Sequence, residues 1–306
     1  MTEVMVCVIT MKRPDQLGLL LNALGALATS SFGYSITVVD NDKAGSAHDV
    51  CKDYLAKGPV ALHYEIEPEP GIVAARNRCV SIFLGSSAQR LVFIDDDELP
   101  QSADWLENMV ACSDRYSADI VVADVLSSSS SNIPTWATEI LYSPSNCPEG
   151  TPKDVFYTGN LLLTRKVLET VTPAFDQRFA LTGASDYHFA IRCGKAGFQA
   201  VFADAPVLEE FPASRATVRW FMRRGYRSGA GHTRSHLIED GAFLVFPKSL
   251  VLSLVRFALG SALLVRGTLS ANKTYLVKGL FRWSSALGTI AGLGGWMHQE
   301  YGELHR

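Results

Sequence analysis

Three aspartates follow an apolar run in the stretch Arg90–Pro100, which reads RLVFIDDDELP. The run is typical of a buried strand, and ligands of open α/β sheets bind beyond the carboxyl ends of the strands. Adjacent carboxylates repel one another unless a cation or a hydrogen-bond donor offsets their charge. A hard divalent cation shared with phosphate oxygens would do so. We therefore predict a strand over Arg90–Asp95 and a cation-binding cluster at Asp95, Asp96 and Asp97; a solvated acidic turn is the alternative.

The sequence on both sides of this stretch alternates between strand-like and helix-like segments. Apolar runs predict strands over Val4–Thr10, Ser35–Asp40, Leu62–Ile66, Ile120–Val125 and Gln199–Asp204. A helix is predicted after Pro14, where leucines recur at helical spacing, and further helices over Gly71–Leu84, Trp105–Ala111 and Ser185–Gly197. Gly159–Leu168 should be a strand that leads into a helix. This alternation predicts an α/β fold with a doubly wound, mostly parallel sheet. Serine and proline predict a long surface loop over residues 127–152.

The composition divides the chain into an acidic and a basic part. The 306 residues are 47% hydrophobic and 19% charged, which excludes a disordered protein. Residues 1–210 carry 15 Lys and Arg against 27 Asp and Glu, whereas residues 211–306 carry 13 against 4. An acidic main part argues against a nucleic-acid partner. The six scattered cysteines, with no CxxC pair, predict buried free thiols in a reducing compartment, and no secretory signal is evident at the N-terminus.

Three further polar residues stand where the predicted elements begin or end. Asp40 ends a strand and could accept a hydrogen bond from a base or a ribose, or could simply cap a helix. Arg76, on a predicted helix, could bind a diphosphate or pair with an aspartate of the cluster. Asp186, in the first turn of a predicted helix, is either a capping residue or a general base.

Six motifs follow one another along the chain: TMKRP (Thr10–Pro14), VVDND (Val38–Asp42), EPGIVAARN (Glu69–Asn77), FIDDDELP (Phe93–Pro100), GN (Gly159–Asn160) and FDQRF (Phe175–Phe179). Taken in this order, they resemble the family 2 inverting glycosyltransferases of the GT-A fold, in particular bacterial enzymes that build exopolysaccharide or other surface glycans. The resemblance covers about residues 4–230 and includes an aspartate motif of the DxD type. One departure is Ser185, which precedes Asp186 where the family often has glutamate. Another is RWFMRRGYRSG (Arg219–Gly229), which replaces the QxxRW signature of processive synthases and favours addition of a single sugar.

The resemblance implies a role for each matching position. It implies inverting transfer from a nucleotide-diphospho-sugar, with a UDP-sugar favoured, to a glycan or polyprenyl-linked acceptor, with Mg²⁺ or Mn²⁺ as cofactor. Residues 1–125 would form the nucleotide-sugar half, residues 126–230 the acceptor half and residues 231–306 a helical tail. Asp97 would bind the metal and Asp186 would be the catalytic base. The nucleotide sugar would be bound by Thr10, Arg13, Asp40, Arg76, Asp95 and Asp96, and the acceptor or a lipid phosphate by Asn160, Arg223, Arg224 and Arg227.

The basic C-terminal part suggests contact with a membrane. Arg219, Arg223 and Arg227 should share one helix face suited to anionic headgroups or a lipid pyrophosphate, although it could be merely solvated. Ala242–Val265 and Trp283–Gln299 are apolar, but neither reaches the roughly 18–20 uncharged residues of a clear span. We expect helices that lie in or dip into the membrane surface, on the cytoplasmic face of the cell membrane, with tryptophans Trp283 and Trp296 as interface anchors. A spanning hairpin and a soluble core or oligomer interface are the alternatives.

Other functions fit the sequence less well. A dinucleotide dehydrogenase is disfavoured because no GxGxxG follows the first strand. An aspartyl phosphatase would carry its DxD on the first strand, not the fourth. A nucleotidyltransferase, or a non-catalytic membrane-associated protein that binds nucleotide sugars, remains as an alternative to the transferase.

Overall fold

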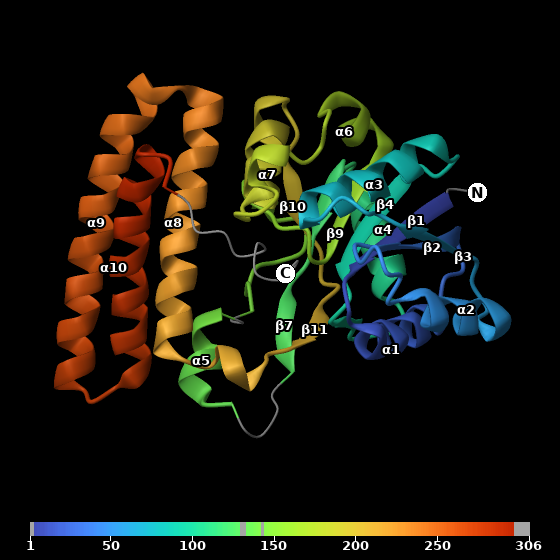
Figure 1. Cartoon of the computed structure of the whole chain (residues 1–306), viewed down its shortest axis with the longest axis horizontal. Helices are drawn as coiled ribbons and strands as arrows, with labels where there is room; N and C mark the ends of the chain where they lie inside the picture. Colours follow the sequence, from blue (N-terminus) through green and yellow to red (C-terminus); the bar gives the residue numbers. More distant parts are fainter. Residues whose placement is uncertain (1–2, 129–132, 142–143, 297–306) are drawn as a thin grey trace.

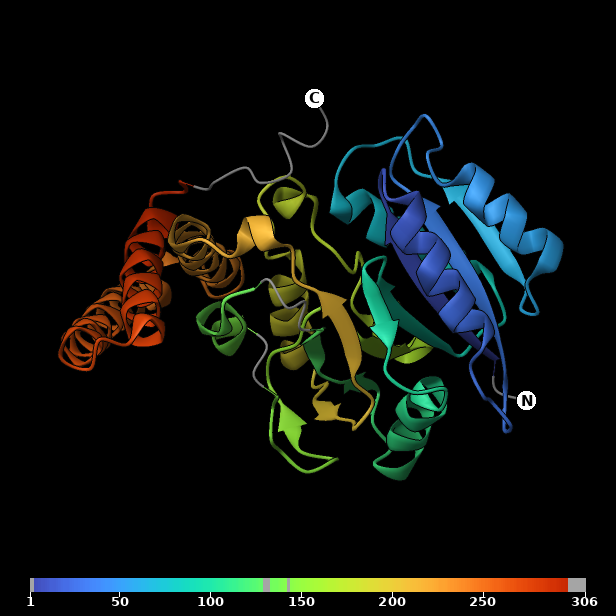
Figure 2. The same cartoon turned by 90° about the horizontal axis from the view of Figure 1, so that it is seen from below.

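A computed structural model describes residues 3–128, 133–141 and 144–296, and shows a sheet domain beside a bundle of three long helices (Figures 1 and 2). The bundle consists of α8 (Val218–Asp240), α9 (Ala242–Leu269) and α10 (Lys273–Leu293). An α/β fold followed by a C-terminal helical segment was predicted, and both are present.

The first half of the sheet is parallel, as predicted. Its strands are β1 (Glu3–Thr10), β2 (Gly33–Asp40), β3 (Leu62–Ile66) and β4 (Arg90–Asp95), in the order β3-β2-β1-β4. The connecting helices are α1 (Pro14–Gly25), α2 (His48–Lys57) and α3 (Ile72–Gly85). Thr10 lies opposite Asp40, and Ile9 lies opposite Asp95. The polar ends of three strands therefore share one edge of the sheet.

The second half continues the same sheet but reverses one strand. β9 (Leu161–Thr164) runs antiparallel between β4 and β6 (Ile120–Val122), followed by β10 (Ala200–Phe202) and β8 (Pro152–Lys153). Leu161 pairs with Phe93, so the chain enters β9 beside the aspartate cluster. The helices of this half are α4 (Trp105–Arg115), α6 (Arg165–Thr170) and α7 (Ser185–Lys195).

The alternation of side chains along the strands divides the core into two layers. Val4, Val6 and Val8 of β1 belong to the layer that includes α1 and α4, whereas Met5 and Cys7 belong to the layer under α3. The same period of two applies to β4, where Ile94 faces the first layer and Phe93 the second. All six cysteines are free thiols, and five of them are buried.

Two sequence predictions fail between β6 and β9. The run Ile120–Val125 is not one strand, because β6 ends at Val122 and β7 (Val125–Ser128) joins a second sheet with β5 (Glu98–Pro100) and β11 (Val207–Glu210). The stretch 127–152 is not simply a loop either, since it contains α5 (Thr135–Leu141) and reaches β8. Residues 129–132 and 142–143 of that stretch lie outside the described residues. Helix α5 forms because Trp136 and Ala137 pack against Phe221 of α8.

Helices α8 and α10 approach each other through glycines. A Cβ on Gly225 would lie 2.6 Å from the carbonyl oxygen of Phe281, and one on Gly229 would overlap the carbonyl oxygen of Ser285. Glycines thus let two helix backbones touch. The expected boundary at residue 230 falls in the middle of α8, so the helical unit begins at residue 218 instead of 231.

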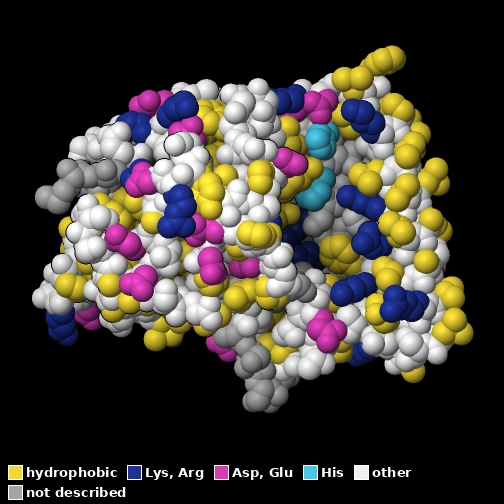
Figure 3. Space-filling model, turned by 180° about the vertical axis from the view of Figure 1, so that it is seen from behind, with side chains coloured by type: hydrophobic (Ala, Val, Ile, Leu, Met, Phe, Trp, Pro, Cys, Tyr) yellow, Lys and Arg dark blue, Asp and Glu magenta, His cyan; other side chains and the backbone are white. Residues whose placement is uncertain are grey.

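Helix α9 is the apolar and exposed member of the bundle. Phe243 is 92% and Leu254 is 71% exposed. Within the described residues, α9, with 28 residues, is the one helix long and apolar enough to cross a membrane, and little of it is buried. Hydrophobic side chains line the outer edge of the bundle in Figure 3.

The second apolar segment, Trp283–Gln299, is only partly in the bundle core, since Leu287 and Ile290 are exposed. It lies in α10 up to Leu293, with Ala286 and Thr289 buried, and residues 297–299 are outside the described part of the chain. Trp283 is not a free interface anchor, because its indole N–H donates to the carbonyl oxygen of Phe257 at 3.1 Å and its ring stacks on that of Phe257. Trp296 is 75% exposed, as an anchor requires.

Candidate active site

Asp95 ends β4, and Asp96 and Asp97 lie in the turn between β4 and β5; their partners are Thr10, which ends β1, and Arg13, which directly precedes α1. Thr10 Oγ1 donates to Asp96 Oδ2 at 2.7 Å. Arg13 Nη1 donates both to Asp96 Oδ1 at 3.0 Å and to Asp97 Oδ2 at 2.7 Å. Burial raises the pKa of Asp96 to about 6, although Arg13 and Thr10 favour its charged form. The structure therefore brings together four of the residues predicted from the sequence.

Asp95 points to the other layer of the sheet, as the period of two requires. Burial raises the pKa of Asp95; the positive charge of Arg76 opposes this shift, and the negative charges of Asp97 and Asp186 add to it. Asp95 thus links the aspartate cluster to the helix α7 that carries Asp186. Two distant sequence motifs converge at this point.

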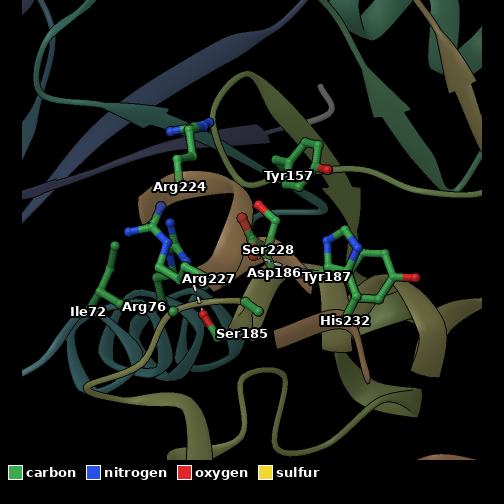
Figure 4. Close-up of a pocket in the computed structure, with 12 residues that line it drawn as sticks. Ile72, Arg76, Tyr157, Ser185, Asp186, Tyr187, Arg224, Arg227, Ser228 and His232 are labelled. Carbon is green, nitrogen blue, oxygen red and sulfur yellow. Dashed lines mark hydrogen bonds between the residues drawn. The ribbon is translucent and has the colours of Figure 1, made fainter. Parts of the chain in front are cut away.

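Asp186 lines a cavity of about 150 Å³ between the sheet domain and α8 (Figure 4). Arg76 of α3 enters the same cavity and is only 6% exposed. Its Nη1 donates to Ser185 Oγ at 3.2 Å, while its Nε has no hydrogen-bond partner. A buried guanidinium with an unpartnered N–H is suited to an anionic ligand. The lining residues are Ile72, Arg76, Tyr157, Gly183, Ala184, Ser185, Asp186, Tyr187, Arg224, Arg227, Ser228 and His232.

Helix α8 provides the basic side of this cavity. Arg224, Arg227 and His232 line it (Figure 4), and Figure 3 shows basic and histidine side chains at a hollow between the bundle and the sheet domain. Of the arginines expected to contact the acceptor, Arg224 and Arg227 line the cavity. Arg223 is exposed and does not line the cavity.

The role predicted for Asp40 is corrected by its hydrogen bonds. Its side chain is fully buried, and it accepts hydrogen bonds from the backbone N–H groups of Asp42 (3.0 Å) and Ala47 (2.8 Å) and from the hydroxyl of Tyr64 (3.1 Å). A carboxylate with these partners shapes the loop after β2. Because Asp40 is completely buried, the expected direct contact with a nucleotide is not supported.

The role predicted for Asn160 is corrected in the same way. It is completely buried; its Nδ2 donates to the carbonyl oxygens of Asp124 (3.0 Å) and Ala205 (2.8 Å), and its Oδ1 accepts from Trp105 Nε1 (2.9 Å). These bonds tie the entry of β9 to neighbouring segments. Asn160 is therefore a structural residue, and the predicted acceptor contact is wrong.

Several residues at the site were not predicted. Glu98 is buried under the cluster and accepts the N–H of Asp95 at 2.9 Å, and a Cβ on Gly159 would overlap its Oε1. The glycine of the GN motif therefore makes room for this carboxylate. The fourth acidic residue of the run DDDE was the available signal.

The aromatic part of the cavity was also missed. The rings of Tyr187 and His232 stack at 3.7 Å, and the Tyr187 hydroxyl lies 3.1 Å from His236 Nε2. Burial and the positive charges of Arg256 and His236 lower the pKa of His232 to about 4. The imidazole of His232 is therefore neutral at physiological pH. Its signal in the sequence was the helical spacing from Arg224 and Ser228.

A divalent cation fits this site only with help from a ligand. The described residues contain no group of three or more His, Cys, Asp or Glu able to form a metal site alone. Asp97 is partly exposed and adjoins two further carboxylates. Magnesium is commonly bound by one or two carboxylates together with phosphate oxygens of a substrate, and this donor set matches that pattern.

These features define a glycosyltransferase of the GT-A fold. Residues 5–172 match the model of glycosyl transferase family 2, and the chain belongs to that family. It is 29% identical over 202 residues to the succinoglycan biosynthesis protein ExoM of Rhizobium meliloti; the match covers 65% of this chain and 64% of that protein, just under two thirds of its length.

Solved structures share the fold. The mannosyltransferase PcManGT from Pyrobaculum calidifontis, solved with GDP-Man and Mn²⁺, has a TM-score of 0.63 at 18% identity and is covered over 86% of its chain and 95% of this one. Residues 1–349 of S. aureus TarS, solved with UDP-GlcNAc, have a TM-score of 0.52 at 13% identity. The match covers 93% of that chain and 98% of this one. At these identities the likeness concerns the fold alone.

Proposed function

We propose that the protein transfers a single sugar, with inversion, from a nucleotide-diphospho-sugar to a lipid-linked glycan acceptor in the synthesis of a bacterial surface polysaccharide. The observation that carries the proposal is the closeness of Asp186 to the cluster Asp95–Asp97: its charge acts on Asp95, and it lines a cavity together with Arg76, Arg224 and Arg227. The family, and the exopolysaccharide role in the printed name of ExoM, support it.

The donor would bind at the aspartate cluster. Asp97, assisted by Asp95 and Asp96, would hold Mg²⁺ or Mn²⁺. When bound, the cation would neutralise charge on the departing nucleoside diphosphate. Arg13 and the buried Arg76 would pair with phosphate oxygens, and a UDP-sugar is the favoured donor.

The acceptor would bind between Asp186 and α8. Its hydroxyl attacks the anomeric carbon from the face opposite the diphosphate, and Asp186 accepts the hydroxyl proton. Attack from that face inverts the anomeric configuration. Arg224 and Arg227 line the same cavity as Asp186, and we assign them to an anionic group of the acceptor, such as a lipid phosphate.

Helix α9 would place the site at a membrane. Its apolar side chains are exposed, and residues 242–296 contain six Lys and Arg but no Asp or Glu. This combination suits an anionic lipid surface, here the cytoplasmic face of the cell membrane. If the protein stays in the supernatant after detergent-free lysis at every salt concentration, the membrane assignment is wrong.

A donor screen followed by turnover tests the function. Nucleotide sugars are ranked by the thermal stabilisation that they give with Mn²⁺, and the best donor is then incubated with lipid extracts of a bacterium that makes surface polysaccharide. Asp97→Asn and Asp186→Asn should each lower turnover by about 10² or more, while Asp49→Asn, at a side chain that is 98% exposed, should not. The product of an α-linked donor should be β-linked by NMR. Near-normal turnover of Asp186→Asn, or an α-linked product, would refute the assigned mechanism.

A further inference from the structure

We propose that Arg13 is the resident counter-ion of the aspartate cluster and makes the binding of a divalent cation conditional on a diphosphate. In the free protein its guanidinium occupies the two carboxylates; when the cation and the diphosphate arrive together, the guanidinium moves to the phosphate oxygens. This inference rests on the proposed function, because it assumes that the cluster is the site of the cation and the donor.

A single nitrogen atom bridges the two carboxylates. Arg13 Nη1 lies 3.0 Å from Asp96 Oδ1 and 2.7 Å from Asp97 Oδ2. A divalent cation that used both of these oxygens would approach each to roughly 2.1 Å, and so would lie beside the positively charged Nη1. The guanidinium and the cation therefore compete for the same pair of oxygens.

The side chain of Arg13 can move while its backbone stays in place. The side chain is 41% exposed, in contrast to the buried Asp96 that it contacts. The backbone is held on both sides, because the N–H of Lys12 donates to Ser46 Oγ at 3.0 Å and Pro14 begins α1. Lys12 has a φ of 56°, a left-handed conformation that a long side chain rarely adopts. The loop thus fixes the base of a long, partly exposed arm beside the cluster.

The charges near the cluster explain why a diphosphate is needed. Arg13 is in direct contact with the carboxylates of Asp96 and Asp97. Displacing Arg13 by a cation alone leaves a guanidinium without its partners. A diphosphate gives it new anionic partners in the planar, two-pronged geometry that a guanidinium prefers. The cation and the diphosphate then bind cooperatively, and the coupling is reciprocal.

The test measures Mn²⁺ affinity from the EPR signal of free Mn²⁺, with and without UDP, on the full chain in mild detergent. The ratio of the two dissociation constants is the coupling factor. Relative to wild type, we expect Arg13→Gln to bind Mn²⁺ alone about 10-fold more tightly and to lower the coupling factor by about 10-fold. Arg178→Gln is the matched control, since Arg178 pairs with Asp176 at an exposed site, and it should leave both values unchanged.

Arg13→Lys provides a second test that keeps the positive charge. It should bind Mn²⁺ alone within about 3-fold of wild type but lose part of the coupling, because an ammonium group lacks the guanidinium fork. The inference is overturned if Arg13→Gln binds Mn²⁺ alone no more tightly than wild type does, or if its coupling factor equals that of wild type. If Arg13→Gln does not fold, an unchanged coupling factor in Arg13→Lys overturns the inference. If wild type binds neither Mn²⁺ nor UDP, the proposed function fails as well, which separates the two failures.

Discussion

Replacing Gly229 by alanine tests the contact between α8 and α10. The added Cβ would overlap the carbonyl oxygen of Ser285 and lie 2.9 Å from the backbone nitrogen of Thr289. Both atoms belong to the backbone of α10, which cannot change conformation as easily as a flexible side chain can. Overpacking of this kind costs about 1–3 kcal/mol, and alanine returns about 1 kcal/mol of helix propensity. Because the obstacle is backbone, we place the cost at the upper end and expect a net loss of about 2 kcal/mol in unfolding free energy.

Gly194→Ala is the matched control for this prediction. Gly194 is also in a helix, but a Cβ there would have no neighbour within 4 Å. Alanine should therefore stabilise the protein by about 0.5–1 kcal/mol. Guanidinium unfolding in one mild detergent, followed by circular dichroism, compares both variants with wild type. If Gly229→Ala raises the unfolding midpoint as Gly194→Ala does, the two helices are not packed through their glycines and the reasoning fails.

Three further substitutions test other parts of the structure. The pKa of His232 is about 4 in the folded protein and about 6.5 when unfolded, so protonation favours the unfolded state as the pH falls from 6.5 to 4. Over that range the unfolding free energy of wild type should fall by up to about 3 kcal/mol more than that of His232→Gln. Equal pH slopes of the two proteins in urea unfolding would contradict this. Asn160→Ala removes three hydrogen bonds and deprives the buried indole N–H of Trp105 and the carbonyl oxygen of Ala205 of their partner, so it should cost about 2–4 kcal/mol; a change below about 0.5 kcal/mol would argue against its structural role. Arg165 donates to four backbone carbonyl oxygens around the end of α3, so Arg165→Lys should lower the thermal midpoint, with a loss of about 1–3 kcal/mol, and an unchanged midpoint would exclude that contribution.

The parallel half of the sheet could be predicted because its information is local. Val4–Thr10 and Arg90–Asp95 are apolar runs bounded by polar residues, and β1 and β4 end as predicted. The helix α5 could not be predicted in this way. It is stabilised by Phe221 and other residues of α8 and α10, which lie about eighty or more positions later in the chain and leave no signal in the segment itself.

The candidate site was predicted well where side chains leave a strand end, and poorly where a loop decides their direction. Thr10, Asp96 and Asp97 stand together because neighbouring parallel strands end at one edge. Asp40 ends a strand in the same way, but the loop that follows β2 covers it and uses its oxygens. The period of two places Asp40 on the face of Ile36 and Val38, toward α2; nothing in the sequence fixes the path of that loop.

The bundle is anchored to the sheet domain at two separate places, which bears on how the protein can be shortened for study. α10 begins on α5, where Thr274 Oγ1 donates to Glu139 Oε2 at 2.9 Å and Lys273 lies over the ring of Trp136. α8 packs on α7, which carries Asp186. A fragment that stops before residue 242 would uncover the glycine face of α8 to water, and it would loosen the helix that lines the reaction cavity. Water-soluble versions are therefore better obtained by replacing the outward leucines and phenylalanines of α9 with polar residues than by cutting the chain.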